Sequence, residues 1–262
     1  MFHMEFIGLP GSGKSSVKKG MIRRLRQHSQ VCLTLEEALL SSLKRSRDDI
    51  FTHYLLRILP NGVSERLLNS LFIRSRYRFI AQNHFLSNAS ASLHVILASE
   101  PFQLMSCEER GLALSRFLRT AITYQAVREQ INEAIPVAFD EGFFQRGTSL
   151  FLLPSWDRNS VRAESVFPYF DAVPSPDLLV LVEADSGKCL NRIESRGLPG
   201  RLKHAKCSSV STFFESCLAY FGHISKWAEK MERPILRIDN NGLPQDAVRA
   251  LSERVMDKLK GE

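Results

Sequence analysis

Residues 8–15 are Gly8-Leu9-Pro10-Gly11-Ser12-Gly13-Lys14-Ser15, and this stretch matches the phosphate-binding loop pattern G-x-x-x-x-G-K-[ST]. The residues before it, Met1 to Ile7, have the pattern of a short buried strand. From Ser16 onward, apolar residues recur every four positions, which predicts a helix. The pattern therefore lies in the context that it requires, between a strand and a helix whose N-terminus faces an anion.

Each position of this loop has a chemical task. The glycines let backbone N–H groups converge on phosphate oxygens, and Lys14 is expected to reach the β and γ phosphates of a nucleoside triphosphate. The hydroxyl of Ser15 is expected to hold Mg²⁺. We assign residues 8–16, with Ser16 included, to nucleotide binding. An ordinary glycine-rich turn is the alternative, and the flanking strand and helix argue against it.

The overall composition is that of a globular protein with a basic surface. The chain has 262 residues, is 44% hydrophobic and has a formal net charge of +7, with a pI near 9.3. This length allows one α/β domain with a helical insertion. No apolar run reaches the roughly 18 residues of a membrane span, and Met1 begins the first strand without a signal peptide, so we expect a cytoplasmic protein with no membrane partner. The charge suits a phosphate-rich partner, although a solvated basic helix surface also explains much of it.

Predicted strands and helices alternate along the chain. Further strands are predicted at 31–34, 135–139, 178–182 and 235–238, and helices at 142–151, 160–171, 186–196, 212–232 and from Pro244. The block 37–133 is mostly helical, with capping boxes at 34–37 and 106–109. This order predicts an α/β fold in one domain over residues 1–262. A parallel sheet has helices on both faces, and ligands bind beyond the carboxyl ends of its strands.

Two acids, Asp140 and Glu141, follow the buried strand 135–139 and are expected at the same rim as the loop. A carboxylate at this place orders Mg²⁺ or accepts a proton from an attacking hydroxyl, and we assign this role to Asp140. Four hydrophobic residues followed by Asp-Glu are also how many ATPases place a water-activating glutamate. The division of roles between the two acids stays open, and a simple helix N-cap is a third alternative.

A second cluster of charge lies near the predicted helix 186–196. Arg192 and Arg196 share a face of that helix, next to a Gly-Leu-Pro-Gly stretch. Two guanidiniums at the mouth of such a loop can stabilise the charge of a migrating phosphoryl group and exclude water. We predict a lid over residues 197–211; a solvated basic loop is the alternative.

Taken in order, these motifs resemble the nucleoside and nucleotide kinases of the thymidylate-kinase type. The matching segments are 8–15, 137–143, 176–185, 192–197 and 238–242. The resemblance implies a P-loop NTPase three-layer fold with ATP as phosphoryl donor and Mg²⁺ as its metal. It implies that Lys14, Asp140, Arg192 and Arg196 are catalytic, that Ser15 and Asp140 hold the metal, and that Asn240 and Asn241 lie near adenine.

The middle of the chain departs from this family. Glu141 follows Asp140 where thymidylate kinases commonly have an arginine, and the first arginine after it is Arg146. The helical block 37–133 is also longer than a minimal nucleotide kinase requires. The acceptor, which we expect on this helical side, is therefore open between a nucleoside, a nucleotide and another metabolite. Candidates for acceptor binding are Glu141, Arg146, Arg76 and Arg110.

The sequence predicts an ATP- and Mg²⁺-dependent kinase that acts on a small-molecule hydroxyl or phosphate. The first alternative is a P-loop ATPase or switch protein that uses Asp140 and Glu141 for hydrolysis, although the N-K-x-D and L-S-G-G-Q patterns are absent from the sequence. A nucleic-acid partner would rest on charge alone. We do not expect one, because the aromatic residues do not interleave with the basic ones in a stacking pattern.

Overall fold

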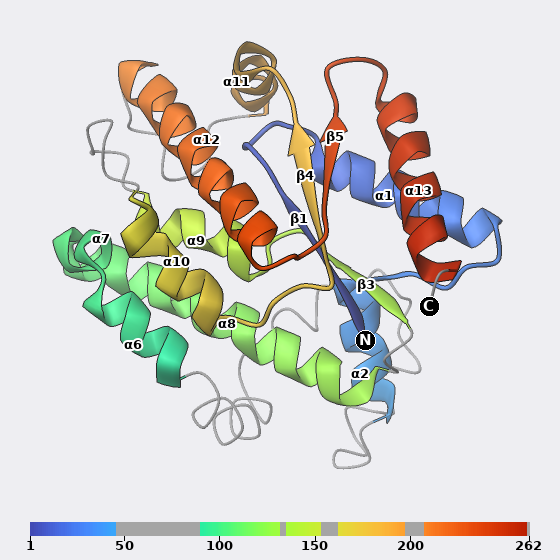
Figure 1. Cartoon of the computed structure of the whole chain (residues 1–262), viewed down its shortest axis with the longest axis horizontal. Coiled ribbons are helices and arrows are strands. Elements are labelled where there is room, and N and C mark those ends of the chain that lie inside the picture. Colours follow the sequence, from blue (N-terminus) through green and yellow to red (C-terminus); the bar gives the residue numbers. More distant parts are fainter. Residues whose placement is uncertain (46–89, 132–134, 153–161, 197–206, 261–262) are drawn as a thin grey trace.

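The first strand of the chain is the centre of its sheet. The structure is a computed structural model that describes residues 1–45, 90–131, 135–152, 162–196 and 207–260. Its sheet is parallel and has the order β2-β3-β1-β4-β5 (Figure 1). The strands are β1 (Phe2–Ile7), β2 (Leu33–Thr34), β3 (Pro136–Phe139), β4 (Leu178–Glu183) and β5 (Ile235–Asp239). The predicted α/β fold is confirmed.

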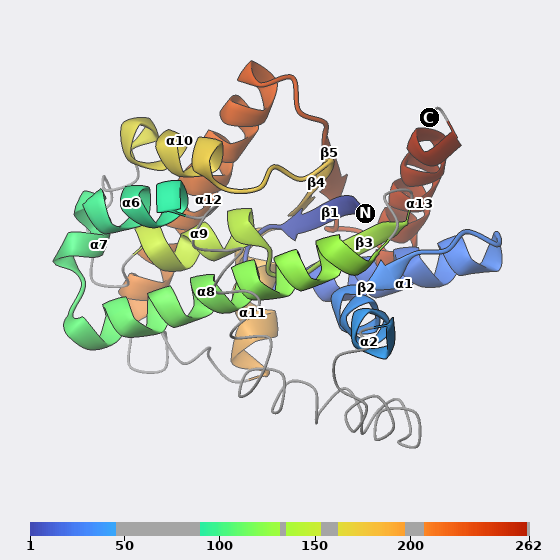
Figure 2. The same cartoon turned by 90° about the horizontal axis from the view of Figure 1, so that it is seen from below.

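Helices cover both faces of this sheet (Figures 1 and 2). One face packs against α1 (Lys14–Gln27) and α13 (Pro244–Lys260). The other faces a larger core built with α8 (Cys107–Gln130), α9 (Phe143–Phe151), α10 (Ala163–Ala172) and α12 (Cys207–Lys230). The remaining helices are α2 (Leu35–Arg45), α6 (Ser90–Ala98), α7 (Glu100–Leu104) and α11 (Ser186–Glu194).

The central strand β1 is buried on both sides. Because side chains alternate along a strand, Phe2, Met4 and Phe6 join the core beneath α1 and α13. The alternate positions, including His3 and Glu5, are turned toward the larger core, and both of these polar side chains are buried. Burying an ionisable side chain costs free energy unless it finds a hydrogen-bond partner, so the contacts of these two residues need an explanation beyond packing.

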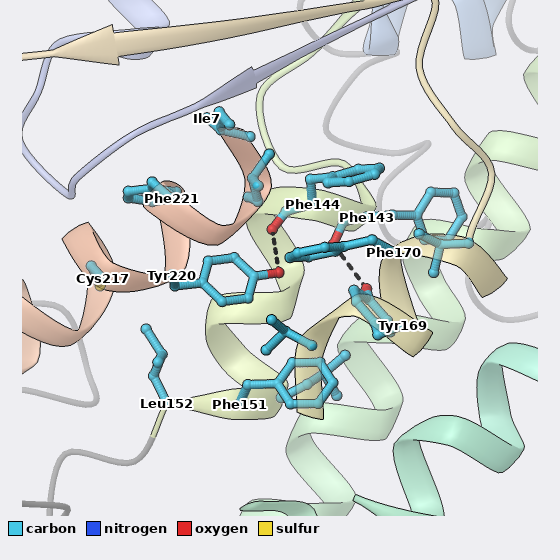
Figure 3. Packing of buried hydrophobic residues seen from close by; sticks show 14 of the residues in the cluster. Ile7, Phe143, Phe144, Phe151, Leu152, Tyr169, Phe170, Cys217, Tyr220 and Phe221 are labelled. Carbon is cyan, nitrogen blue, oxygen red and sulfur yellow. Dashed lines mark hydrogen bonds between the residues drawn. The ribbon is translucent and has the colours of Figure 1, made fainter. Parts of the chain in front are cut away.

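Helix α9 begins where β3 ends and is held by two tyrosines of the aromatic core (Figure 3). Tyr169 Oη donates a hydrogen bond to the carbonyl of Phe143 at 2.8 Å, and Tyr220 Oη donates one to the carbonyl of Phe144 at 3.0 Å. These tyrosines come from α10 and α12, so two distant helices fix the first turn of α9. Gly147 gives Tyr220 the room to approach.

Most of the predicted boundaries agree with the structure. Both capping boxes are formed: Thr34 and Glu37 exchange bonds of 2.8 and 3.1 Å, and Ser106 and Glu109 exchange bonds of 2.9 and 3.2 Å. The described parts of 37–133 are mainly helical, as predicted. No helix of the described ranges is long and apolar enough to cross a membrane.

The predicted lid at 197–211 needs a correction at its end. Helix α12 begins at Cys207, before the predicted start at 212, and Val210 is buried in the larger core. Residues 207–211 therefore belong to a packed helix, because burial of an apolar side chain outweighs the polar, loop-like local sequence. Residues 197–206 lie outside the described residues.

Candidate phosphate-binding site

The loop between β1 and α1 requires glycine at positions where the chain turns closely against its neighbours. Gly11 has a φ of 79°, and a Cβ there would lie 2.4 Å from the carbonyl oxygen of Cys189. Gly13, the N-cap of α1, has a φ of 89°, and a Cβ there would lie 2.4 Å from Nδ2 of Asn240. Other side chains rarely adopt these angles. The loop is thus fitted between α11 and the end of β5.

The ammonium of Lys14 lies folded over this loop. Its Nζ donates to the carbonyls of Gly8 and Leu9 at 2.8 and 2.9 Å. Burial lowers the pKa of Lys14 to about 8, and the negative charges of nearby groups, Asp140 and Glu141 among them, oppose that shift. The loop therefore already holds a cation at its mouth.

The first acid of the strand end, Asp140, lies beside α1. Strands β1 and β3 pair in parallel, with Glu5 opposite Phe139, so the acid follows directly at the rim. Its Oδ2 lies 3.0 Å from Nζ of Lys18, one turn after Lys14 on the same helix. The side chain of Lys18 is only 3% exposed, and Asp140 is its ion-pair partner. The other carboxylate oxygen, Oδ1, is buried and has no hydrogen-bond partner among the described residues.

The second acid, Glu141, forms an ion pair with Arg146 of α9. The glutamate side chain is 60% exposed and that of the arginine 15%. Burial lowers the pKa of Arg146, and the pairing with Glu141 opposes this. The acid therefore stands at the solvent edge, while the guanidinium lies largely within the protein.

Two further arginines stand near this guanidinium. The positive charges of Arg119 and Arg116, both on α8, also lower the pKa of Arg146. The two helices are held together by an edge-to-face contact between Phe117 and Phe143, whose ring centroids lie 5.9 Å apart. The packing of α8 against α9 thus brings the charges of Arg116 and Arg119 within electrostatic reach of Arg146.

On the other side of the loop lie Arg192 and Asn240. Nη1 of Arg192 donates to the carbonyl of Gly11 at 3.1 Å, and Nδ2 of Asn240 donates to the carbonyl of Ser12 at 2.7 Å. Both residues thus contact the loop directly. Arg192 lies in the last turn of α11, which follows β4, and Asn240 directly follows β5.

The described contacts of the other candidates are with residues outside the loop. Helix α11 ends at Glu194, so the exposed Arg196 lies beyond it. The prediction that Arg192 and Arg196 share a helix face is therefore wrong. Asn241 accepts a bond from the backbone of Asp185 at the start of α11. Arg110 contacts Cys107 of its own helix. Arg76 lies outside the described residues.

Sequence reasoning missed two residues that hold the start of the loop. The backbone N–H of Gly8 donates to Oε1 of Gln145 at 3.0 Å, and the backbone N–H of Gln145 donates to Oε1 of Glu5 at 2.8 Å. Burial raises the pKa of Glu5 to about 8, against the lowering effect of the backbone N–H groups at the start of α9. A glutamate within a mostly apolar strand was the available signal for this contact.

Comparisons with known proteins give similarity of structure alone. No family model matches the chain, and no curated protein matches its sequence. Similar solved structures include three of deoxyadenosine kinase from M. mycoides. The one with products dCMP and a flexible dCDP bound is 13% identical, with 99% of each chain covered and a TM-score of 0.46. The one with bound dCTP is 11% identical over 99% of each chain, with a TM-score of 0.47, and the one with bound dATP is 13% identical over 98% of each, with a TM-score of 0.46. At these TM-scores the matches carry no argument about what this chain binds.

Proposed function

We propose that this chain is an ATP- and Mg²⁺-dependent kinase that transfers the γ-phosphoryl group to a hydroxyl or phosphate of a small molecule. The observation that carries the proposal is that Lys14, at the start of α1, and Asp140, directly after the adjacent strand β3, lie at the same rim of the sheet. Phosphoryl transfer depends mainly on positioning and on stabilisation of charge, and such a rim supplies a cation for the donor next to an acid.

Buried polar atoms without partners support a nucleotide and a metal at this rim. Among the described residues, Oδ1 of Asp140 and Oγ of Ser12 are buried and accept or donate no hydrogen bond. Ser15 adds an exposed hydroxyl in the first turn of α1. Carboxylate and hydroxyl oxygens are the ligands that Mg²⁺ prefers, and the residues present therefore fit the group. Bound Mg²⁺ would withdraw charge from the phosphates and align them.

The donor side would be built by residues that already contact the loop. Lys14 would exchange its two loop carbonyls for phosphate oxygens, because a charged acceptor binds an ammonium more strongly than a carbonyl does. Arg192 would add a second cation from α11. Asn240 would hold the carbonyl of Ser12 in place and so keep the loop open. Asp140 would accept the acceptor's proton or order the metal.

The acceptor side would lie toward α8 and α9. The positive charges on this side outnumber the negative ones, since three arginines, Arg146, Arg116 and Arg119, are near each other. Within the described part of the chain, Arg146 is paired with one acid, Glu141. An excess of guanidiniums favours an acceptor that carries an anionic group, since planar guanidiniums bind phosphate and carboxylate well. The helical block that contributes α8 fits the predicted acceptor side.

The hydrolytic alternative receives less support. Glu141 is paired with the guanidinium of Arg146 at the solvent edge, whereas Asp140 keeps one buried carboxylate oxygen without a hydrogen-bond partner among the described residues. The two functions can be told apart by experiment, because an ATPase would release ADP at a rate that does not depend on any acceptor.

The test is a screen for acceptor-dependent ADP release. Purified protein with Mg²⁺ and ATP is offered nucleosides, nucleoside monophosphates, sugars and aminoglycoside-like alcohols. We expect at least one class to accelerate ADP release many-fold, and Lys14→Ala to reduce that rate at least about a hundred-fold while the melting temperature is kept. ADP release that no acceptor changes would favour the ATPase, and a Lys14→Ala variant with unchanged turnover would overturn the proposal.

A further inference from the structure

One side chain links the phosphate loop to the helix that follows the strand-end acids. Gln145, in the first turn of α9, accepts the N–H of Gly8 through Oε1 at 3.0 Å. Its own N–H donates to Glu5 of the central strand at 2.8 Å. The loop's first residue, the first turn of α9 and β1 are therefore connected by two consecutive hydrogen bonds.

The α9 end of this connection is firmly held. Tyr169 and Tyr220 bond the first two carbonyls of the helix from α10 and α12 (Figure 3). Below the N-cap, the carboxyl group of Glu5 lies so close that a Cβ on Gly142 would be 2.4 Å from it. Contacts from three separate elements thus fix the backbone from which Gln145 extends.

The loop end of the connection is the point at which the chain leaves β1. Gly8 has a φ of 149°, and a Cβ there would lie 2.4 Å from the carbonyl oxygen of Val182. Its N–H is directed to Gln145, so this amide positions the loop instead of contacting a ligand. Because the backbone at Gly8 lacks the constraint of a side chain, the hydrogen bond helps to set the direction in which the loop begins.

We propose that Gln145 is a positioning residue for phosphoryl transfer, which sets the phosphate loop relative to the strand end that holds Asp140. The inference rests on the proposed function. Helix α9 follows Asp140 after a short turn, and Gln145 returns from that helix to the start of the loop. Donor loop and acid are thereby joined by a short path through α9, in addition to the sheet between them.

Loss of this bond should affect the rate more than binding. Lys14 and the N–H groups of the loop remain available to phosphates when Gln145 is replaced, so affinity for ATP is kept. The placement of those phosphates relative to Asp140 becomes less defined, and transfer is sensitive to small errors of placement. A residue needed only for folding would lower stability and both kinetic parameters together.

The experiment compares Gln145→Met with Gln145→Glu. The methionine variant has a similar length and no acceptor atom, whereas the glutamate variant keeps an acceptor oxygen. For Gln145→Met we expect kcat to fall about ten-fold or more with the best acceptor of the screen, and the Kd of ATP to change less than about two-fold. In the nucleotide-free protein we expect the Gly8 amide to exchange hydrogen faster, and Gln145→Glu to retain its protection.

Gln125→Met is the matched control. Gln125 lies on α8 and donates to Glu129 of the same helix, so the same chemical change there should leave all readouts at the wild-type values. Wild-type kcat in Gln145→Met, or equal losses of kcat and of ATP affinity, would overturn the positioning role. If the wild-type protein neither binds ATP nor transfers phosphate, the proposed function fails instead, while Gly8 exchange in the nucleotide-free protein still reports whether the bond exists.

Discussion

In the proposed nucleotide site, the ammonium of Lys14 would make binding depend on pH. Burial holds its pKa at about 8 while its Nζ bonds the carbonyls of Gly8 and Leu9. A polyphosphate placed at the loop would favour the charged form and raise this pKa. By linkage, binding above about pH 8 must take up a proton, and affinity must fall as the pH rises through that value.

We therefore predict that the Kd of MgATP increases several-fold between about pH 7 and about pH 9.5. Calorimetric titrations in buffers of different ionisation enthalpy measure both the affinity and the proton uptake. Lys14→Arg serves as the control, because a guanidinium stays charged over this range, and its Kd should hardly vary with pH. A wild-type affinity independent of pH, without proton uptake, would contradict the prediction.

The two strand-end acids should respond differently to substitution. Asp140→Asn leaves the buried charge of Lys18 with a neutral partner, so we predict a loss of about 1–3 kcal/mol in the free energy of unfolding and a large fall in kcat. Glu141→Gln removes the acid paired with the largely buried guanidinium of Arg146, but the glutamate itself is 60% exposed, so we expect a smaller stability loss of about 1 kcal/mol.

Urea denaturation and acceptor-dependent turnover provide the two measurements. The double variant Lys18→Met/Asp140→Asn separates the effects, because it removes the unpaired charge and should recover stability without recovering kcat. Recovery of the Asp140→Asn rate at high Mg²⁺ would assign metal ordering to Asp140. If kcat survives both single substitutions, this strand end has no catalytic role.

Helix α9 offers a test of how its packing is specified. A Cβ on Gly147 would lie 1.8 Å from Oη of Tyr220, whereas a Cβ on Gly222 of α12 would meet nothing within 4 Å. We predict that Gly147→Ala destabilises the protein by about 2–4 kcal/mol, because neither a tyrosine ring nor a helix backbone can yield by that distance. Gly222→Ala should stabilise by up to about 1 kcal/mol through helix propensity alone.

Thermal unfolding of both variants gives the comparison. Adding Tyr220→Phe to Gly147→Ala removes the clashing hydroxyl and should restore part of the loss, although the hydrogen bond to Phe144 is also removed. Equal effects of the two alanine substitutions would show that the close approach of Tyr220 does not limit the position of α9.

Elements with local signals could be predicted, and those shaped by distant contacts could not. The capping boxes that begin α2 and α8 form as the sequence indicates, because they need only residues three positions apart. Strand β2 is shorter than the predicted 31–34. The carbonyl of Cys32 accepts two hydrogen bonds from the guanidinium of Arg26 on α1, at 3.2 and 2.8 Å. Because this carbonyl is bonded to a side chain, it does not pair with β3, and the strand begins only at Leu33.

For the protein as a whole, two buried groups of β1 govern how stability depends on pH. Burial lowers the pKa of His3 to about 3 and raises that of Glu5 to about 8. The folded protein thus binds fewer protons than the unfolded chain at His3 between about pH 3 and 6.5, where stability rises with pH. At Glu5 it binds more protons between about pH 4.5 and 8, where stability falls as pH rises.

Between about pH 6.5 and 8 the contribution of Glu5 acts without that of His3. We predict that the free energy of unfolding decreases there by on the order of 2 kcal/mol, and that Glu5→Gln abolishes the decrease while it keeps an oxygen for the N–H of Gln145. Urea midpoints at the two ends of this range are the measurement. The same decrease in Glu5→Gln as in the wild type would assign it to another group.

The candidate site was predictable where it depends on motifs and strand ends. Lys14 follows from the loop pattern, and Asp140 from the end of a buried strand that pairs with β1. Lys18 and Gln145 gave no comparable signal, because their roles arise only when α1 packs beside β3 and α9 folds back to Gly8. The arginines of α8 are likewise brought to Arg146 by helix packing, over a distance in sequence that no local pattern spans.

The order of the sheet has a consequence for the way the protein is made. β1 leaves the ribosome before both of its partners in the sheet, β3 and β4, which begin only at Pro136 and at Leu178. Until both strands have been translated, β1 is an apolar segment with two unpaired edges. Such a segment tends to associate with other nascent chains and with chaperones. The phosphate loop also depends on β4, since Gly8 packs closely against the backbone of Val182 in that strand. A product terminated before Leu178 would thus contain the complete loop sequence 8–15 and still lack the strand β4 against which Gly8 packs.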